Sequence, residues 1–160
     1  MRRPWFSLGP VGVDFFETAP LLLKESFEIP LEAEPVWGDL MSENPLAWCR
    51  ILRGVEWTSP RPFGVGATRT ARAVGGLVIH ERFFRWEEGR RHSFFVEEAN
   101  VPFFRRFAED CLVEPTSGSS CRLTWTIAIE LRAVAGIGAF AGRPILETAF
   151  RDTRRHYRSL

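Results

Sequence analysis

Apolar and polar residues alternate along the middle of the chain with the period of two that is typical of β-strands. In the stretch CRLTWTIAIELRA, Leu123, Trp125 and Ile127 would point to one face and the residues between them to the other. This alternation is typical of an antiparallel sheet with one buried face and one face in water. With the turn signals between the runs, the pattern predicts six strands, near residues 51–58, 65–74, 77–87, 90–99, 104–114 and 120–132.

The residues before these six strands predict three further elements. A first strand is expected at 21–31, where apolar residues again recur at every second position. A short helix should follow, because Glu34–Pro35 is a good helix start and apolar residues then lie at helical spacing. A second short helix is expected from Pro45 to Arg50.

The two ends of the chain differ from the middle. Residues 133–160 return to helical spacing, and the sheet would curl around this last helix. Pro144 should kink or interrupt it, so we expect a firm helix from about residue 143 onward. Residues 1–20 are rich in proline, glycine and phenylalanine and have no clear period. We therefore predict an N-terminal extended arm at 1–20 and a single domain at 21–160.

The hairpin formed by the third and fourth of the six strands carries large apolar side chains on both faces. Phe83 and Phe94 fall on one face, which we expect to line the core or a cavity. Phe84, Trp86 and Phe95 fall on the other face, which would be the convex side of the sheet and is normally wet. Three exposed rings predict a covered surface. We expect the N-terminal arm to cover it, with a second copy of the chain as the alternative.

The strand at 65–74 indicates a cavity, because its inner face consists mostly of alanine and would leave space unfilled. A three-residue connection at Val74–Gly76 would place Arg69 opposite Glu81 and Ala71 opposite Ile79. A two-residue turn would instead place Arg69 opposite Arg82 and reverse every face. We favour the first register, which also sets Glu81 near Val96. An apolar wall with few polar groups is typical of a small-molecule site.

Two interpretations of Arg69 and Glu81 remain open. They form a structural ion pair between two strands, or Arg69 anchors a carboxylate, phenolate or carbonyl of a ligand while Glu81 positions it or acts as a base. His92 is a second candidate base, although a lone strand histidine is more often at a rim or solvated. The predicted ligand-binding residues, some of which would equally serve as core, are Arg69, Ala71, Ile79, Glu81, Phe83, Phe94, Val96, Trp125 and Phe140.

Composition narrows the functional classes. The 160 residues suffice for one domain, and 21 basic residues are balanced by 20 acidic ones, so no nucleic-acid partner is indicated. Lys24 is the single lysine, which leaves none in the body of the chain for a Schiff base. The three cysteines have no CxxC spacing, so neither a disulfide framework nor a metal site is indicated. No signal peptide or membrane span is recognised, and we expect a soluble, cytoplasmic protein without cofactor.

The ordered set of elements resembles the SRPBCC superfamily, which includes the START lipid-transfer domains and the bacterial polyketide cyclase/dehydrase-like proteins. The resemblance implies a helix-grip fold: a curved seven-stranded antiparallel sheet wrapped around a long C-terminal helix, with two short helices after the first strand. It also implies a cavity for a sterol, phospholipid, polyketide, quinone or plant hormone. The stretches that carry the likeness are SFEIPLEAEPVWGDLMS, VEWTSPRPFGVGATRTARA, IHERFFRWEEGRRHSFFV, RLTWTIAIEL and the terminal amphipathic helix.

Three functions follow from these patterns. The first is a non-enzymatic binding or carrier protein for a hydrophobic small molecule, because no catalytic or phosphate-binding spacing is present. The second is a cofactor-independent cyclase, dehydratase or isomerase that uses Arg69, Glu81 and His92. The third is a protein-interaction module with a filled interior. We expect a monomer or homodimer with a small-molecule ligand and without stable membrane insertion.

Overall fold

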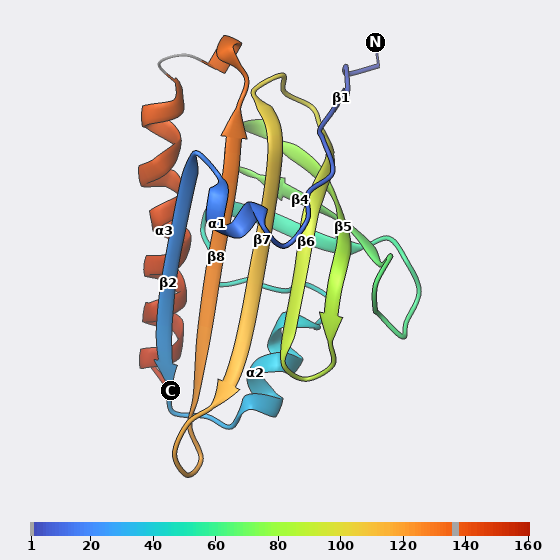
Figure 1. Ribbon diagram of the computed structural model, residues 1–160. Coiled ribbons are helices and arrows are strands. Elements are labelled where there is room, and N and C mark those ends of the chain that lie inside the picture. Colours follow the sequence, from blue (N-terminus) through green and yellow to red (C-terminus); the bar gives the residue numbers. More distant parts are fainter. Residues whose placement is uncertain (1, 136–137) are drawn as a thin grey trace.

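The computed structural model describes residues 2–135 and 138–160, apart from the side chains of residues 134 and 138–141. Seven of its strands form one curled antiparallel sheet (Figure 1), in the order β2-β8-β7-β6-β5-β4-β3. The short connections from β3 to β8 make a meander, and β2 closes the row by pairing with β8. The strands are β2 (Leu21–Ile29), β3 (Leu52–Trp57), β4 (Thr68–Ala73), β5 (Val78–Glu87), β6 (Arg91–Ala99), β7 (Phe104–Pro115) and β8 (Cys121–Leu131).

The helix α3 (Gly138–Arg158) lies against the concave side of the sheet, beside β2 and β8 (Figure 1). Its Phe150 ring packs edge-on against Trp125, at 5.2 Å between centroids, and also contacts Phe27. The helix begins at Gly138 and continues through Pro144, so the predicted interruption there is wrong. Packing of its apolar side on the sheet outweighs the hydrogen bond that a proline removes. No helix in the described ranges is both long and apolar enough to cross a membrane.

One end of the curled sheet is closed by α2 (Ala33–Leu40), the first of the two predicted short helices. The second predicted helix, from Pro45 to Arg50, is wrong because these residues form turns. Leu46 has a φ angle of 60°, which an α-helix does not accept. The segment is held by α3 instead, since Asp152 accepts hydrogen bonds from the backbone N–H and the guanidinium of Arg50, at 2.9–3.2 Å.

The N-terminal residues cover part of the convex face of the sheet, as predicted. The strand β1 (Phe6–Ser7) pairs with β6, and the helical turn α1 (Phe15–Thr18) lies over β7 and β8. The Phe15 side chain is only 1% exposed and packs on Ala108 and Ala128, whose small side chains leave room for the ring. Phe16 stacks on Phe84, with 6.1 Å between ring centroids.

Trp86 does not share the convex face with Phe84, so that prediction is wrong. The register of β5 and β6 shifts between Phe83 and Arg85, which identifies a β-bulge at Phe84. A bulge inserts one residue into a strand and exchanges the faces beyond it. The Trp86 ring therefore lies on the concave side, 5.2 Å from the ring of Phe83 and 5.7 Å from that of Trp37 on α2.

Candidate functional site

A cavity of about 370 Å³ lies between the concave face of the sheet and α3. Each strand from β2 to β8 contributes at least one side chain to its wall, and α3 contributes Ile145, Leu146 and Ala149. Small residues such as Ala71 on β4 leave the space open. Nearly all of the lining is apolar, and the ionisable residues in the described part of the wall are Arg69, Glu81 and Glu109.

Six of the nine predicted ligand-binding residues line this cavity. Phe83 and Val96 are buried beside it, packed among other core side chains. The side chain of Phe140 lies outside the described residues, so its predicted position has no structural counterpart here. The six lining residues are Arg69, Ala71, Ile79, Glu81, Phe94 and Trp125.

The strand register around the cavity is the one favoured from the sequence. Arg69 pairs with Glu81 and Ala71 with Ile79, because the connection at Val74–Gly76 has three residues. Gly75 and Gly76 both have positive φ angles, at 75° and 78°, which glycine adopts without strain. The connection thus fixes which side chains point inward, and it brings a guanidinium and a carboxylate together inside the sheet.

Arg69 and Glu81 form a closed pair at the deep end of the cavity. The guanidinium donates a hydrogen bond from Nε to Oε2 of Glu81, and the two residues are only 4% and 3% exposed. Three aromatic rings surround the guanidinium carbon: Phe94 at 4.7 Å, Phe83 at 4.9 Å and Trp57 at 5.3 Å. Burial raises the pKa of Glu81, and the neighbouring Arg69 opposes that rise. The rings and Glu81 together occupy the surroundings of the cation.

Glu109 is a cavity residue that the sequence analysis missed. It lies on β7, opposite Phe94 on β6 and Ile127 on β8, and its Oε2 accepts a hydrogen bond from Nε1 of Trp125 at 2.8 Å. Burial, followed by the negative charge of Glu81, raises the pKa of Glu109 to about 8. Its carboxyl group is thus mostly protonated at neutral pH.

A signal for Glu109 is present in the sequence. In β7 it shares a face with Phe107, Cys111 and Val113, all of which are buried. A single glutamate on an otherwise apolar strand face indicates either a buried carboxyl group or a register error. The strong alternation of β8 favours a buried carboxyl group over a register error, because β7 and β8 pair along their whole length.

His92 lies outside the cavity wall and beneath α2. Its ring is surrounded by those of Phe83, Trp37 and Trp86, at centroid distances of 5.2–6.0 Å, and neither ring nitrogen has a hydrogen-bond partner among the residues that the structure describes. Burial, followed by the positive charge of Arg69, lowers the pKa of His92 to about 3. The imidazole is neutral and has no contact with the cavity, so the structure gives the proposed general-base role no support.

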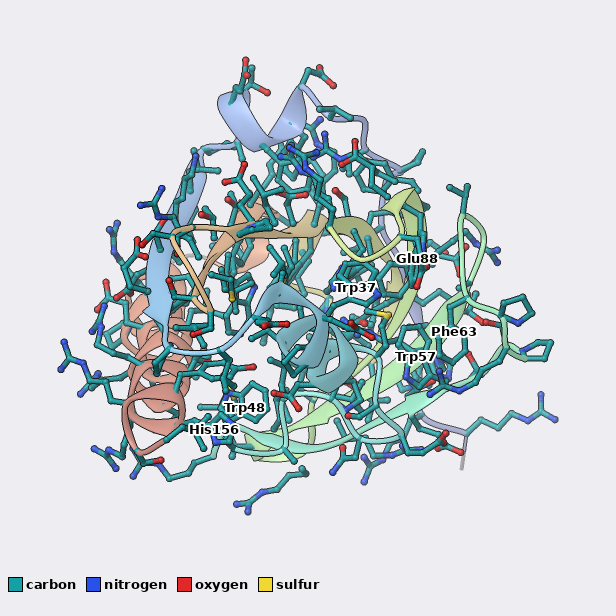
Figure 2. The ribbon with its side chains drawn as sticks, turned by 90° about the horizontal axis from the view of Figure 1, so that it is seen from below. Trp37, Trp48, Trp57, Phe63, Glu88 and His156 are labelled. Atoms are coloured by element: carbon teal, nitrogen blue, oxygen red, sulfur yellow. The ribbon has the colours of Figure 1, made fainter. Side chains whose placement is uncertain are left out.

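The two ends of the cavity differ in how they meet the solvent. Phe103 and Ile145 line the wall and are nevertheless 45% and 47% exposed, which marks the mouth between the β6–β7 loop and the first turns of α3. Figure 2 shows α2 across the opposite end of the sheet. There, Glu88 accepts hydrogen bonds from the indoles of Trp37 and Trp86, at 3.2 and 2.7 Å, which fastens α2 to the β5–β6 turn.

Two further tryptophans at this end of the sheet pack against other side chains (Figure 2). Trp48 stacks on His156 of α3 at 4.1 Å between centroids, and its Nε1 donates to Thr153. Trp57 stacks on Phe63 at 3.8 Å (Figure 2). These contacts close the α2 end of the sheet, so a ligand would reach the buried carboxyl groups from the mouth beside Phe103.

Comparison with known proteins agrees with this architecture. The family model described as polyketide cyclase/dehydrase and lipid transport matches residues 21–157. An uncharacterised protein of Mycobacterium bovis is 38% identical over 151 residues, which make up 92% of this chain and 89% of the relative. An uncharacterised protein of Mycobacterium tuberculosis matches to the same extent.

Solved structures show the same fold at low sequence identity. A START superfamily protein from Mycobacterium smegmatis has a TM-score of 0.67 at 12% identity, with 86% of this chain and 97% of that one covered. A major latex-like protein from Panax ginseng has a TM-score of 0.61 at 18% identity, with 85% and 96% covered. The predicted helix-grip fold is confirmed. The chain therefore belongs to the polyketide cyclase/dehydrase and lipid transport family.

Proposed function

We propose that the protein binds a hydrophobic small molecule, such as a lipid, polyketide or quinone, in the cavity between the sheet and α3. The observation that carries the proposal is the size and lining of this cavity. Protein cores pack without voids much larger than a water molecule. A largely apolar space of about 370 Å³ is instead within the usual range of ligand pockets. The third predicted function, a protein-interaction module with a filled interior, does not agree with this open cavity.

The mouth supports the same function. Phe103 and Ile145 are exposed and continuous with the cavity wall, so an apolar molecule would stay in contact with apolar surface as it enters.

Cys49, Cys111 and Cys121 are buried free thiols, which suits a reducing compartment. A cytoplasmic location and a monomeric or homodimeric state remain predictions.

Native mass spectrometry of protein purified without added ligand tests the proposal. We expect a bound species whose mass is recovered by solvent extraction, and whose chemistry is that of a lipid, polyketide or quinone. A ligand-free mass, together with no shift in melting temperature from a panel of hydrophobic compounds, would count against a binding function.

A second candidate function is a cyclase or dehydratase, and Glu109 favours it. A carboxyl group with a pKa of about 8 holds its proton at neutral pH inside an apolar cavity, and such a group serves as a general acid. Extracts of the wild-type protein and of Glu109→Gln distinguish enzyme from carrier. A dehydratase would leave a product in the wild type that is one water lighter than the compound bound to the variant, and a cyclase would leave an isomer of that compound. Identical compounds in both would indicate a carrier.

A further inference from the structure

The three ionisable side chains of the cavity wall differ in how accessible they are to a ligand. Arg69 and Glu81 are almost fully buried against each other and against aromatic rings. Glu109 is only partly covered, and its remaining accessible surface faces the cavity. Trp125 donates to Oε2 of Glu109, and no further hydrogen bond to this carboxyl group is present among the described residues. Oε1 of Glu109 is therefore a polar atom outside the Arg69–Glu81 ion pair that a ligand can reach.

The ion pair with Glu81 neutralises Arg69, which would otherwise be the usual anchor for an acidic ligand. A guanidinium binds a carboxylate through its planar fork of N–H donors. Here the guanidinium bonds Glu81, and its carbon lies within 5.3 Å of three ring centroids. A ligand carboxylate that bound Arg69 would share this one cation with Glu81, so one of the two negative charges would be buried without a counter-ion, which is strongly unfavourable.

We propose that Glu109 is the polar anchor of the ligand, and that the cavity selects uncharged hydrophobic molecules with an accepting oxygen, such as a ketone, ester or quinone carbonyl, over carboxylates. This inference rests on the proposed binding function and names the ligand class of that site. Trp125 holds one oxygen of Glu109, and the other donates its proton to the carbonyl of the ligand. The hydrocarbon part then fills the apolar space towards Phe103.

The charged and titratable groups around Glu109 also disfavour a second negative charge in the cavity. Arg69 on β4 is the one cation in the described part of the cavity wall and Glu81 on β5 is its partner, so an ionised Glu109 would lack a counter-ion. The nearby thiols of Cys111, on its own strand, and of Cys49 both have a raised pKa because they are buried, and they carry no charge at neutral pH. An incoming carboxylate would meet two carboxyl groups and no free cation.

The proton on Glu109 gives the inference a definite pH dependence. The neutral carboxyl group donates to a carbonyl, whereas the ionised one does not and repels it. Affinity for a ketone should therefore be constant below neutral pH and fall as the pH rises through about 8. A cationic amine would behave in the opposite way, because its binding would improve as Glu109 ionises.

A matched series of twelve-carbon probes tests the proposal by displacement of the neutral dye Nile red at pH 6 and pH 9. The probes are dodecane, a straight-chain methyl ketone, dodecanoate and dodecylamine. At pH 6 we expect the ketone to bind about tenfold more tightly than dodecane, as one net hydrogen bond provides, and at least about tenfold more tightly than dodecanoate. At pH 9 the advantage of the ketone over dodecane should disappear.

Two variants isolate Glu109 from the rest of the wall. Glu109→Leu should bind dodecane as the wild type does and lose the preference for the ketone. Glu109→Gln retains an N–H donor, so it should keep that preference and lose its pH dependence. Dodecane affinity in each variant serves as the control for a folded, open cavity.

The outcomes separate this inference from the binding function on which it rests. If none of the probes displaces the dye, both fail. If dodecane and the ketone bind equally in the wild type, or if Glu109→Leu leaves the ketone preference intact, the cavity binds ligands and Glu109 is not the anchor. Equal binding of dodecanoate and the ketone at pH 6, or tighter binding of dodecylamine than of the ketone at pH 6, also overturns the proposal.

Discussion

Glu109 combines an ionisable group with an apolar setting, and its protonation connects ligand choice to the stability of the fold. Its pKa is raised by burial and by Glu81 from 4.5 to about 8, so the folded state favours the protonated form. Stability from this source is complete below the unfolded-state pKa and is lost as the pH rises through the folded-state value.

We therefore predict that Glu109→Gln is more stable than the wild type at pH 9, with the difference shrinking towards pH 5. The wild type should lose at most about 1.4 kcal/mol per pH unit between pH 5 and pH 8, relative to the variant. Urea unfolding at several pH values measures this difference. Parallel pH profiles of the two proteins would mean that Glu109 titrates normally.

Arg69 and Glu81 give a second prediction at the residue scale. Arg69→Ala removes the partner of a buried carboxylate and should lower the free energy of unfolding by about 3–5 kcal/mol. A double variant, Arg69→Leu with Glu81→Leu, should be less destabilised because no unpaired charge remains. Arg72→Ala is the matched control on the same strand, since its ion pair with Glu56 is exposed and contributes little.

At the scale of elements, the sequence predicted the seven strands of the main sheet well. The position of Trp86 and the second short helix were predicted wrongly, and each error has a specific structural cause. The register of β4 and β5 was predicted as the favoured of two, because the glycines at 75 and 76 allow either a two-residue turn or the three-residue connection that pairs Arg69 with Glu81. Trp86 was misplaced because a bulge at Phe84 leaves no sequence signal as clear as alternation. The second short helix failed because partners on α3, about a hundred residues away, determine the path of that segment.

The candidate site was predictable in part for the same reasons. Arg69 and Glu81 were found because each is a charge on a strand face that is otherwise small or apolar. Glu109 carries the same signal, as one charge on the β7 face of Phe107 and Val113, but it was not among the predicted residues. The division into an arm at 1–20 and a domain at 21–160 remains a prediction.

The arm supplies a prediction about an element. Phe15→Ala should loosen the arm on the convex face, because the buried Phe15 ring packs on Ala108 and Ala128. Loss of such a ring typically costs about 3–5 kcal/mol. Limited proteolysis should then cleave the arm faster, and the melting temperature should fall. Val13→Ala, at a half-exposed site on the same arm, should change neither.

For the whole molecule, the property that determines the proposed function is the cavity between the curled sheet and α3. Ala71→Phe would place a ring in the cavity and should reduce binding of extractable compounds or Nile red, while the protein stays folded. Ala47→Phe introduces the same ring at an exposed site and is the control. Undiminished binding in Ala71→Phe, with binding also retained in the control, would place the ligand elsewhere.

The cavity also has a consequence for the abundance of the protein. Atoms that line an empty space lack neighbours on one side, so the vacant form forgoes packing attraction that an occupant would restore. A molecule that binds only the folded state shifts the folding equilibrium in proportion to its concentration. Cellular proteases remove chains according to how often they unfold. The cell would thus accumulate this protein when its cargo is plentiful and degrade it when the cargo is scarce, without a dedicated regulator.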